Sequence, residues 1–252
     1  MALVHTSVIR ILYILGLAYL ITTIGVGIWQ RRLLYFPSHE PVSTRLGRWM
    51  KEGMFLGYAR VTAQPAVVWL MTHGNGGQAA EREYTLSCFP EQDSVYFLEY
   101  PGYGPRAGSP SLASINAAAK EGYEELRRLY PGRRVCVAGE SLGTGPACYL
   151  CTLPQPPDKV VLVVPFNRIV DVAAEAFRFL PVRWLMLDRW NNAEALRHYS
   201  GPIEIYGAKA DEVIPVKHAT SLAHDIPQAK FQLVDGRHNE WYASGQVRFT
   251  GP

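Results

Sequence analysis

Short runs of consecutive apolar residues alternate with longer amphipathic stretches over most of the chain. Such runs, rich in β-branched residues, are typical of strands that are buried on both faces of a parallel sheet. We therefore predict strands at residues 66–71, 95–98, 135–138, 159–164, 203–206 and 231–234, and helices at 111–130, 144–153, 169–179 and 216–224. This alternation predicts an α/β fold with a mostly parallel sheet and helices on both of its faces.

The pattern is weaker between residues 33 and 64, where polar residues and glycines interrupt it. Short runs there, such as Met54-Phe55-Leu56, fit antiparallel edge strands. The chain has 252 residues, which is long enough for one large α/β domain with a substantial core. We expect residues 33–252 to form that single domain.

A different pattern opens the chain. Residues 11–29 are 19 positions without a charge, bounded by Arg10 and by Arg31-Arg32. As a helix this stretch measures about 28 Å, close to the roughly 30 Å hydrocarbon core of a bilayer. It is longer than the apolar region of a typical signal peptide, no small-residue cleavage site follows it, and it lacks the polar face of a core helix. We predict an uncleaved single-pass membrane anchor over residues 1–32.

The arginines around this segment suggest an orientation. Arg31, Arg32, Arg45 and Arg48 on the domain side outnumber Arg10 and the terminal amine on the other side. Positive residues concentrate on the cytoplasmic side of membrane proteins, so the count favours a cytoplasmic domain, although folded domains can cross a membrane regardless of charge.

Composition argues against two classes of partner. The net charge is only +3, without a basic block or an interleaved basic and aromatic stripe, which argues against nucleic acid. The cysteines lack metal-ligand spacing, and we expect buried apolar residues rather than a zinc site or a disulfide framework. These cysteines are Cys88, Cys136, Cys148 and Cys151. We expect no metal and no cofactor.

The candidate chemistry begins with Gly139-Glu140-Ser141-Leu142-Gly143, which fits G-x-S-x-G. The motif follows a predicted strand and precedes a predicted helix, which is the context that a nucleophile elbow requires. A turn this tight leaves no room for a Cβ on either side of the serine, and it presents the hydroxyl at the carboxyl edge of the sheet. The pattern alone can arise by chance, but in this context it indicates that Ser141 is a nucleophile.

A second motif, His73-Gly74-Asn75-Gly76-Gly77, follows the predicted strand at 66–71. Glycines there let the backbone approach a ligand closely, and free N–H groups can face an oxyanion. Taken alone, the motif fits an ordinary glycine turn equally well. Because it follows the first predicted sheet strand and precedes the elbow, we assign a second oxyanion donor to the backbone N–H of Asn75. We expect His73 to be a structural hydrogen-bonding group and not a base.

A serine nucleophile needs a base, and the base needs an acid to orient it; both come from loops at the carboxyl ends of later strands. His238 follows the last predicted strand and is the candidate base. Asp211 follows the strand at 203–206 and is the candidate acid, although a helix N-cap or a turn would also explain it. His218 and His224 lie on a predicted amphipathic helix, where a solvated surface position is the more common role. Three other carboxylates remain alternatives to Asp211: Asp188, Glu212 and Asp235.

Several blocks occur in order along nearly the whole chain: HGNGG, YPGYG, GESLGTGPA, FLPVRWLMLDRW, YGAKADEVIP and GRHNE, behind an N-terminal apolar segment and LLYFPS. In these blocks the chain resembles the membrane-anchored serine hydrolases called alpha/beta-hydrolase-domain-containing proteins, of the alpha/beta-hydrolase superfamily, a group that includes protein depalmitoylases. The resemblance implies the alpha/beta-hydrolase fold with Ser141 as nucleophile, Asp211 as acid and His238 as base. It also implies an oxyanion hole made by the N–H groups of Leu142 and Asn75.

Two features depart from the family pattern. Arg237 precedes His238, where relatives usually have a small residue, and only 14 residues follow His238, so we expect a short closing helix. Both features would alter the rim of the pocket and not the chemistry. Residues 166–202 form a small lid insertion between strands, whose apolar side chains would supply a wall of an acyl pocket or would simply pack in the core: Phe177, Phe179, Leu180, Trp184 and Leu185.

We therefore interpret the sequence as a membrane-tethered serine hydrolase with residues 33–252 as its catalytic domain. It would cleave a carboxylic ester or thioester through an acyl-enzyme on Ser141, with His238 and Asp211 completing the triad. A peptidase on the same triad is an alternative, although the small insertion shows no sign of a site for a peptide backbone. A catalytically silent membrane-bound scaffold is the other, and the complete set of three residues argues against it. The expected partners are the acyl substrate and the lipid bilayer.

Overall fold

The computed structural model describes the backbone of residues 2–252 and the side chains of residues 7–252. Its main element is an eight-stranded sheet with the strand order β10-β9-β8-β7-β4-β6-β3-β2. The strands from β10 to β6 in this order pair in parallel, and β3 and β2 add an antiparallel edge. The bounds are β2 Gly47–Lys51, β3 Met54–Arg60, β4 Val67–Thr72, β6 Ser94–Leu98, β7 Arg134–Glu140, β8 Val160–Val163, β9 Ile203–Ala208 and β10 Lys230–Val234.

The sheet confirms the predicted α/β fold, and each predicted strand ends within two residues of the observed one. Residues 54–56 belong to β3, which is antiparallel as predicted. β3 is not an edge strand, however, because β2 pairs along its outer side. A separate parallel pair joins β1 (Phe36–Pro37) to β5 (Gly76–Gly77), next to the predicted oxyanion loop.

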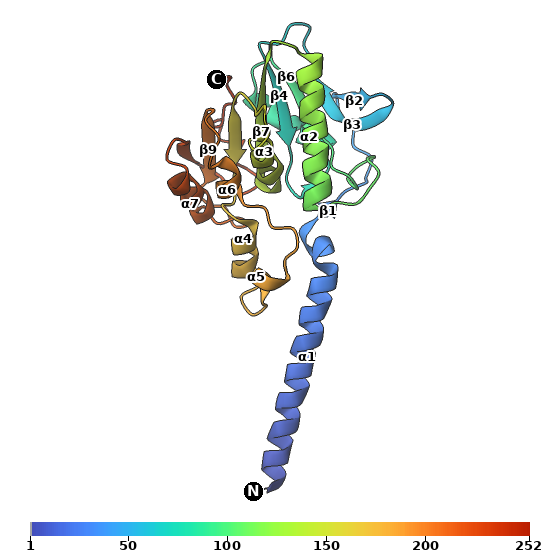
Figure 1. Cartoon of the computed structure of the whole chain (residues 1–252), viewed down its shortest axis with the longest axis vertical. Helices are drawn as coiled ribbons and strands as arrows, with labels where there is room; N and C mark the ends of the chain where they lie inside the picture. Colours follow the sequence, from blue (N-terminus) through green and yellow to red (C-terminus); the bar gives the residue numbers. More distant parts are fainter. Residues whose placement is uncertain (1) are drawn as a thin grey trace.

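Helical segments cover both faces of the sheet (Figure 1). Side chains of successive β4 residues point to opposite faces, so Val68 and Leu70 join one apolar cluster while Trp69 and Met71 join the other. The first cluster packs on α2, α3 and α7, and the second packs on the 3-10 helix η1 and on the C-terminal segment. The bounds are η1 Ala79–Cys88, α2 Leu112–Leu129, η2 Ser141–Gly143, α3 Thr144–Leu150, α4 Ile169–Ala176, α5 Val182–Leu185, α6 Asn192–Leu196 and α7 Lys217–Asp225.

Two smaller expectations have different outcomes. The cysteines are all buried with free thiols, as predicted. After His238, however, the chain forms turns instead of the short closing helix that we expected. Trp241 and Phe249 hold this segment on the sheet, since both side chains are fully buried in the second cluster.

Local signals set the bounds of the longest helix of the domain, α2. The Ser111 hydroxyl accepts a hydrogen bond of 3.0 Å from the backbone N–H of Ser114, and the Ser114 hydroxyl accepts one of 2.9 Å from the N–H of Ser111. This reciprocal capping box satisfies two N–H groups that a helix start leaves without partners. Beyond the other end, Gly132 has a φ of 76°, a conformation that favours glycine and stops the helix.

The helix α1 (Ala2–Leu34) projects from the domain, with the N-terminus at its far end (Figure 1). Its part Ser7–Leu34 is long enough to cross a membrane; the most apolar window within it has a mean hydropathy of 2.1, and the protein buries 0% of that window. A helix that satisfies its own backbone hydrogen bonds and is apolar on all sides suits a bilayer. Figure 1 also shows α4 and α5 beside the domain end of α1.

Candidate active site

Ser141 lies at a tight turn between β7 and α3. Its φ is 53°, in the left-handed region that residues with side chains rarely adopt. A Cβ on Gly139 would lie 2.7 Å from the carbonyl oxygen of Gly143, and one on Gly143 would lie 2.1 Å from the carbonyl oxygen of Thr72. Both positions therefore require glycine. The Thr72 hydroxyl also donates a hydrogen bond of 2.8 Å to the Gly143 carbonyl, which ties the turn to the end of β4.

The structure brings together the three residues that the sequence predicted as a triad. Ser141 Oγ lies 2.9 Å from His238 Nε2, and His238 Nδ1 lies 2.9 and 2.8 Å from Asp211 Oδ1 and Oδ2. An ionised carboxylate only accepts, so Nδ1 carries the proton and Nε2 is left to accept from the Ser141 hydroxyl. The side chains of His238 and Asp211 are 6% and 1% exposed. This arrangement is suited to nucleophilic catalysis by Ser141.

The loop after β9 fixes the carboxylate of Asp211. Asp211 Oδ1 accepts hydrogen bonds from the backbone N–H groups of Val213 and Ile214 at 2.9 and 2.7 Å. Because these donors belong to the same short loop, they orient the carboxylate toward the imidazole of His238 without help from a distant element.

The three alternative carboxylates are engaged elsewhere. Glu212 is the nearest to the site, but it lies 3.4 Å from the backbone nitrogen of His238 and not from its ring. Their side-chain partners are Arg31 and Tyr35 for Asp188, Lys209 and Gln246 for Asp235, and Arg237 for Glu212. The unexpected Arg237 thus forms an ion pair of 3.1 Å with Glu212 beside the triad.

His73 has the structural environment that we expected. Its Nδ1 lies 2.7 Å from the carbonyl oxygen of Gly74, and its ring stacks on Tyr100 with the centroids 4.1 Å apart. The side chain is 1% exposed, and its Nε2 lies 3.4 Å from the buried carboxylate of Glu99. These contacts hold the residue that precedes the glycine loop.

The histidines of α7 differ from each other. His224 is 89% exposed, as expected for a solvated helix face. The same expectation is wrong for His218, whose side chain is only 7% exposed and whose Nε2 lies 3.3 Å from Glu175 in α4. The reason is that Glu175 of α4 contacts this side of α7, a contact between distant segments that helical periodicity does not show.

A cleft of about 340 Å³ opens at Ser141, and Asn75 forms part of its wall. The Asn75 side chain donates a hydrogen bond of 2.8 Å to the carbonyl oxygen of Leu34, the last residue of α1. Its own carbonyl oxygen accepts from the N–H of Phe36 at 3.0 Å and from the hydroxyl of Tyr103 at 2.8 Å. The end of α1 therefore positions the loop that carries the predicted oxyanion donor.

Sequence reasoning missed the role of Glu140, the variable residue before Ser141. Its buried carboxylate accepts hydrogen bonds from the Trp241 indole at 3.0 Å and the Tyr84 hydroxyl at 2.9 Å, and lies 3.6 Å from Arg82 Nε. Burial alone would raise the pKa of Glu140, but Arg82 and the two donors hold it below its ordinary value. The available signal was a charged residue at the end of a buried strand, which requires partners.

Comparisons with known proteins identify relatives of the chain. No family model matches the chain. The uncharacterized protein Rv2307c of Mycobacterium tuberculosis is 31% identical over 227 residues, which cover 82% of this chain and 79% of that protein. Lysophosphatidylserine lipase ABHD12 of Danio rerio is 27% identical, over 67% of this chain and 49% of its own length. The solved Pyrococcus furiosus esterase Pf2001 matches 81% of this chain and 90% of its own, with a TM-score of 0.61 at 15% identity.

The chain belongs to the alpha/beta-hydrolase superfamily. It is a hydrolase, as is the lipase among its relatives. The similarity to the solved esterase concerns the fold, because only 15% of the aligned residues are identical.

The lid of this alpha/beta hydrolase, residues 166–202, forms α4, α5 and α6. Phe179 and Trp184 are 84% and 89% exposed, so packing in the core does not explain them. Phe177 and Leu185 instead line a groove against α1. These four side chains of the lid therefore face solvent or the groove against α1, while others, such as Phe166 and Leu196, pack in the core.

Proposed function

We propose that the chain is a membrane-tethered serine hydrolase that cleaves a carboxylic ester or thioester through an acyl-enzyme. The observation that carries this proposal is the hydrogen-bonded line from Ser141 through His238 to Asp211, next to an open cleft. The lipase name of the ABHD12 relatives, which specifies lysophosphatidylserine, supports a lipid ester as the substrate.

In the first step His238 Nε2 takes the proton of the Ser141 hydroxyl while Oγ attacks the acyl carbon. Asp211 stabilises the imidazolium that forms. The proposed donors to the oxyanion are the N–H groups of Asn75 and Leu142, each worth about 10²–10³ in rate. Two facts support them: the Asn75 N–H has no hydrogen-bond partner within the described part of the chain, and the first N–H groups of a helix, such as that of Leu142 in η2, lack intrahelical acceptors.

The second half of the reaction reverses these proton transfers. The leaving alcohol or thiol takes the proton from His238, and the acyl group remains on Ser141 as an ester. A water molecule then attacks this ester, gives a proton to His238, and releases the carboxylic acid as Ser141 regains its proton. The triad returns to its starting state.

We further propose that residues 1–32 anchor the enzyme and that residues 33–252 form its catalytic domain. Support comes from the apolar character of α1 and from its exposure along the most apolar window. The excess of arginines on the domain side of the apolar stretch favours the cytoplasmic side of the membrane.

Labelling with a fluorophosphonate probe tests the proposal. The wild-type protein should react, and Ser141→Ala should lose both the labelling and about 10⁶ in kcat on a soluble ester while its Tm stays close to that of the wild type. A wild-type protein that resists the probe would support the silent scaffold instead. Esters and thioesters of graded chain length, with a peptide set beside them, would separate the acyl hydrolase from the peptidase.

A further inference from the structure

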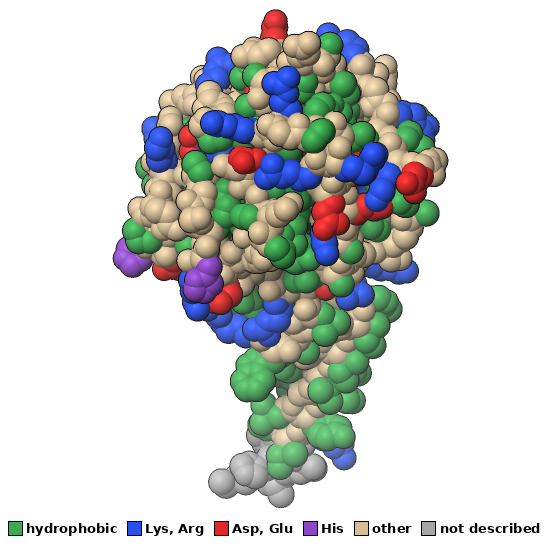
Figure 2. All heavy atoms as spheres, turned by 45° about the horizontal axis from the view of Figure 1, so that its top comes forward, with side chains coloured by type: hydrophobic (Ala, Val, Ile, Leu, Met, Phe, Trp, Pro, Cys, Tyr) green, Lys and Arg blue, Asp and Glu red, His purple; other side chains and the backbone are tan. Residues whose placement is uncertain are grey.

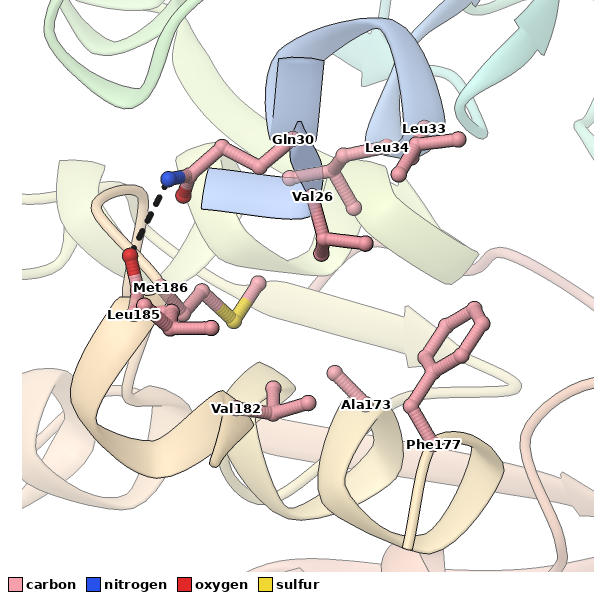
Figure 3. Close-up of a pocket in the computed structure, with 9 residues that line it drawn as sticks. All are labelled: Val26, Gln30, Leu33, Leu34, Ala173, Phe177, Val182, Leu185 and Met186. Atoms are coloured by element: carbon pink, nitrogen blue, oxygen red, sulfur yellow. Dashed lines mark hydrogen bonds between the residues drawn. The ribbon is translucent and has the colours of Figure 1, made fainter. Parts of the chain in front are cut away.

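An apolar groove of about 100 Å³ lies between the domain end of α1 and the lid (Figure 3). Val26, Leu33 and Leu34 of α1 form one wall, and Ala173, Phe177 and Leu185 of the lid contribute to the other. Gln30 is the single polar residue among those that line the groove in the described chain. The chemistry of the groove therefore suits a hydrocarbon ligand.

Polar contacts fix the lid to α1 at this place. Gln30 Nε2 donates to the carbonyl oxygen of Leu185 at 3.0 Å, and Gln30 Oε1 accepts from the N–H of Leu187 at 2.7 Å (Figure 3 shows the first of these). A single side chain of α1 thus binds the lid backbone at two places, Leu185 and Leu187. Arg31 adds an ion pair of 3.0 Å with the buried Asp188. These contacts hold the two walls of the groove in fixed positions relative to each other.

The sequence of α1 indicates where the groove would lie relative to a bilayer. Residues 11–30 carry no charge, and Arg31 marks the domain end of this stretch. A Cβ at Gly27 would lie 3.7 Å from Leu185 Cδ2, so the lid touches α1 one turn before Arg31. At 1.5 Å per residue, this contact lies about 6 Å from Arg31 on the membrane side. If α1 spans a bilayer, the tip of the lid reaches its hydrocarbon.

The exposed side chains of the lid match this position. Phe179 and Trp184 are almost fully exposed, and the neighbouring Arg178, Arg183 and Arg189 are exposed as well. Figure 2 shows Lys and Arg side chains gathered where the domain meets the apolar helix. Aromatic and basic side chains of this kind concentrate at membrane interfaces, where the rings meet the acyl region and the guanidinium groups meet phosphates.

A hydrogen bond links the wall of the groove to the wall of the cleft at Ser141. Leu34 lies in the groove wall, and its carbonyl oxygen accepts the hydrogen bond from Asn75, which lines the cleft. We propose that the groove takes one acyl chain of a bilayer lipid, which enters sideways from the membrane and places its ester carbonyl at Ser141. This inference rests on the proposed function, because it names the substrate of the same site.

The test compares two substrates with the full chain in phosphatidylcholine liposomes: a long-chain monoacylglycerol in the bilayer and a soluble short-chain ester. Val26→Trp fills the groove from α1 and leaves the core of the domain untouched, while Ala173→Phe fills it from α4. The matched control is Ile28→Trp, at a position of α1 that is 71% exposed and outside the groove. The readout is the ratio of kcat/KM on the long-chain substrate to kcat/KM on the short-chain ester.

Each buried methylene contributes about fourfold to binding, so a blocked groove should lower this ratio at least about tenfold in both groove variants. Ile28→Trp should keep the wild-type ratio. An unchanged ratio in Val26→Trp would overturn the inference, whether or not Ala173→Phe folds and whatever ratio it gives. Failure of the proposed function looks different: the wild type would hydrolyse neither substrate, or Ser141→Ala would hydrolyse both as well as the wild type.

Discussion

Replacing Asp211 by asparagine would reverse the hydrogen bond that sets the tautomer of His238. Asp211 Oδ1 accepts from the backbone N–H groups of Val213 and Ile214. The asparagine oxygen would keep these two bonds, because an amide nitrogen cannot accept them. The NH₂ group would then take the place of Oδ2, 2.8 Å from His238 Nδ1, and would donate to it. The imidazole proton would move to Nε2, which could no longer accept the proton of Ser141.

We expect this change to lower kcat about 10⁴-fold, the loss that a wrong histidine tautomer causes in a serine triad. At 1.36 kcal/mol for each factor of ten, the loss corresponds to about 5 kcal/mol of transition-state stabilisation. The fold should be affected much less, since the two backbone hydrogen bonds survive. One altered hydrogen bond changes the free energy of unfolding by about 1 kcal/mol.

The assay is hydrolysis of a soluble short-chain ester, with thermal unfolding measured in parallel. Asp235→Asn is the matched control, because Asp235 also follows a strand of the sheet but pairs with Lys209 at the surface. It should keep the wild-type kcat. If Asp211→Asn retained a kcat within tenfold of the wild type at a similar Tm, Asp211 would not orient the base, and the assignment of the acid would be refuted.

Three further predictions follow from other parts of the structure. kcat/KM should fall in acid, because a protonated Nε2 cannot accept from Ser141; a flat profile down to about pH 4 would argue against His238 as the base. Glu140→Gln should lower the free energy of unfolding by about 3 kcal/mol at pH 7 and the Tm by roughly 6–12 °C, because it leaves the largely buried Arg82 without its charge partner. The pKa of Glu140 is lowered in the fold, so its contribution to stability is present above the ordinary value of about 4.3 and is lost as the pH falls through the lowered value. The difference in Tm between the wild type and Glu140→Gln should therefore shrink in acid. A difference that stayed constant with pH would contradict an ionised Glu140. Gln30→Leu should destabilise the attachment of the lid by about 1 kcal/mol for each of the two hydrogen bonds to the lid that it removes. Limited trypsin digestion should then cleave after Arg178 or Arg183 at least tenfold faster than in the control Ile28→Leu. Equal rates of cleavage would argue against the contact between Gln30 and the lid.

The parallel part of the fold could be predicted because its strands are buried on both faces. A run such as residues 66–71 has to be apolar throughout, and this leaves a clear signal in the sequence. The two antiparallel strands left a weaker signal, since β2 is exposed at the edge and only Trp49 along it is fully buried. The strand at 54–56 was therefore recognised in part, while its neighbour at the edge was not.

The candidate triad could be predicted for a related reason. Ser141, Asp211 and His238 each follow a predicted strand, and the carboxyl ends of parallel strands lie along one edge of a sheet. No comparable rule predicts the contacts of Glu140 from the sequence. Arg82 and Trp241 come from η1 and from the C-terminal turns, so only the three-dimensional structure shows that they meet one carboxylate. The same holds for Asn75, whose hydrogen bond to the end of α1 joins two segments that sequence patterns treat as independent.

The helix α1 shows most clearly what hydropathy omits. α1 is apolar on all sides, so its sequence marks no face for contact with the domain, and we predicted a segment separate from the catalytic domain. In the structure a stripe at helical spacing is partly covered: Thr23, Val26, Gly27, Gln30 and Leu34. Deleting residues 1–32 would therefore remove Gln30 and Arg31, which hold the lid, together with the proposed membrane anchor. A loss of activity after such a deletion would not separate tethering from support of the lid. Gln30→Leu tests the support of the lid by itself, because it removes two hydrogen bonds to the lid and leaves the apolar stretch of α1 in place.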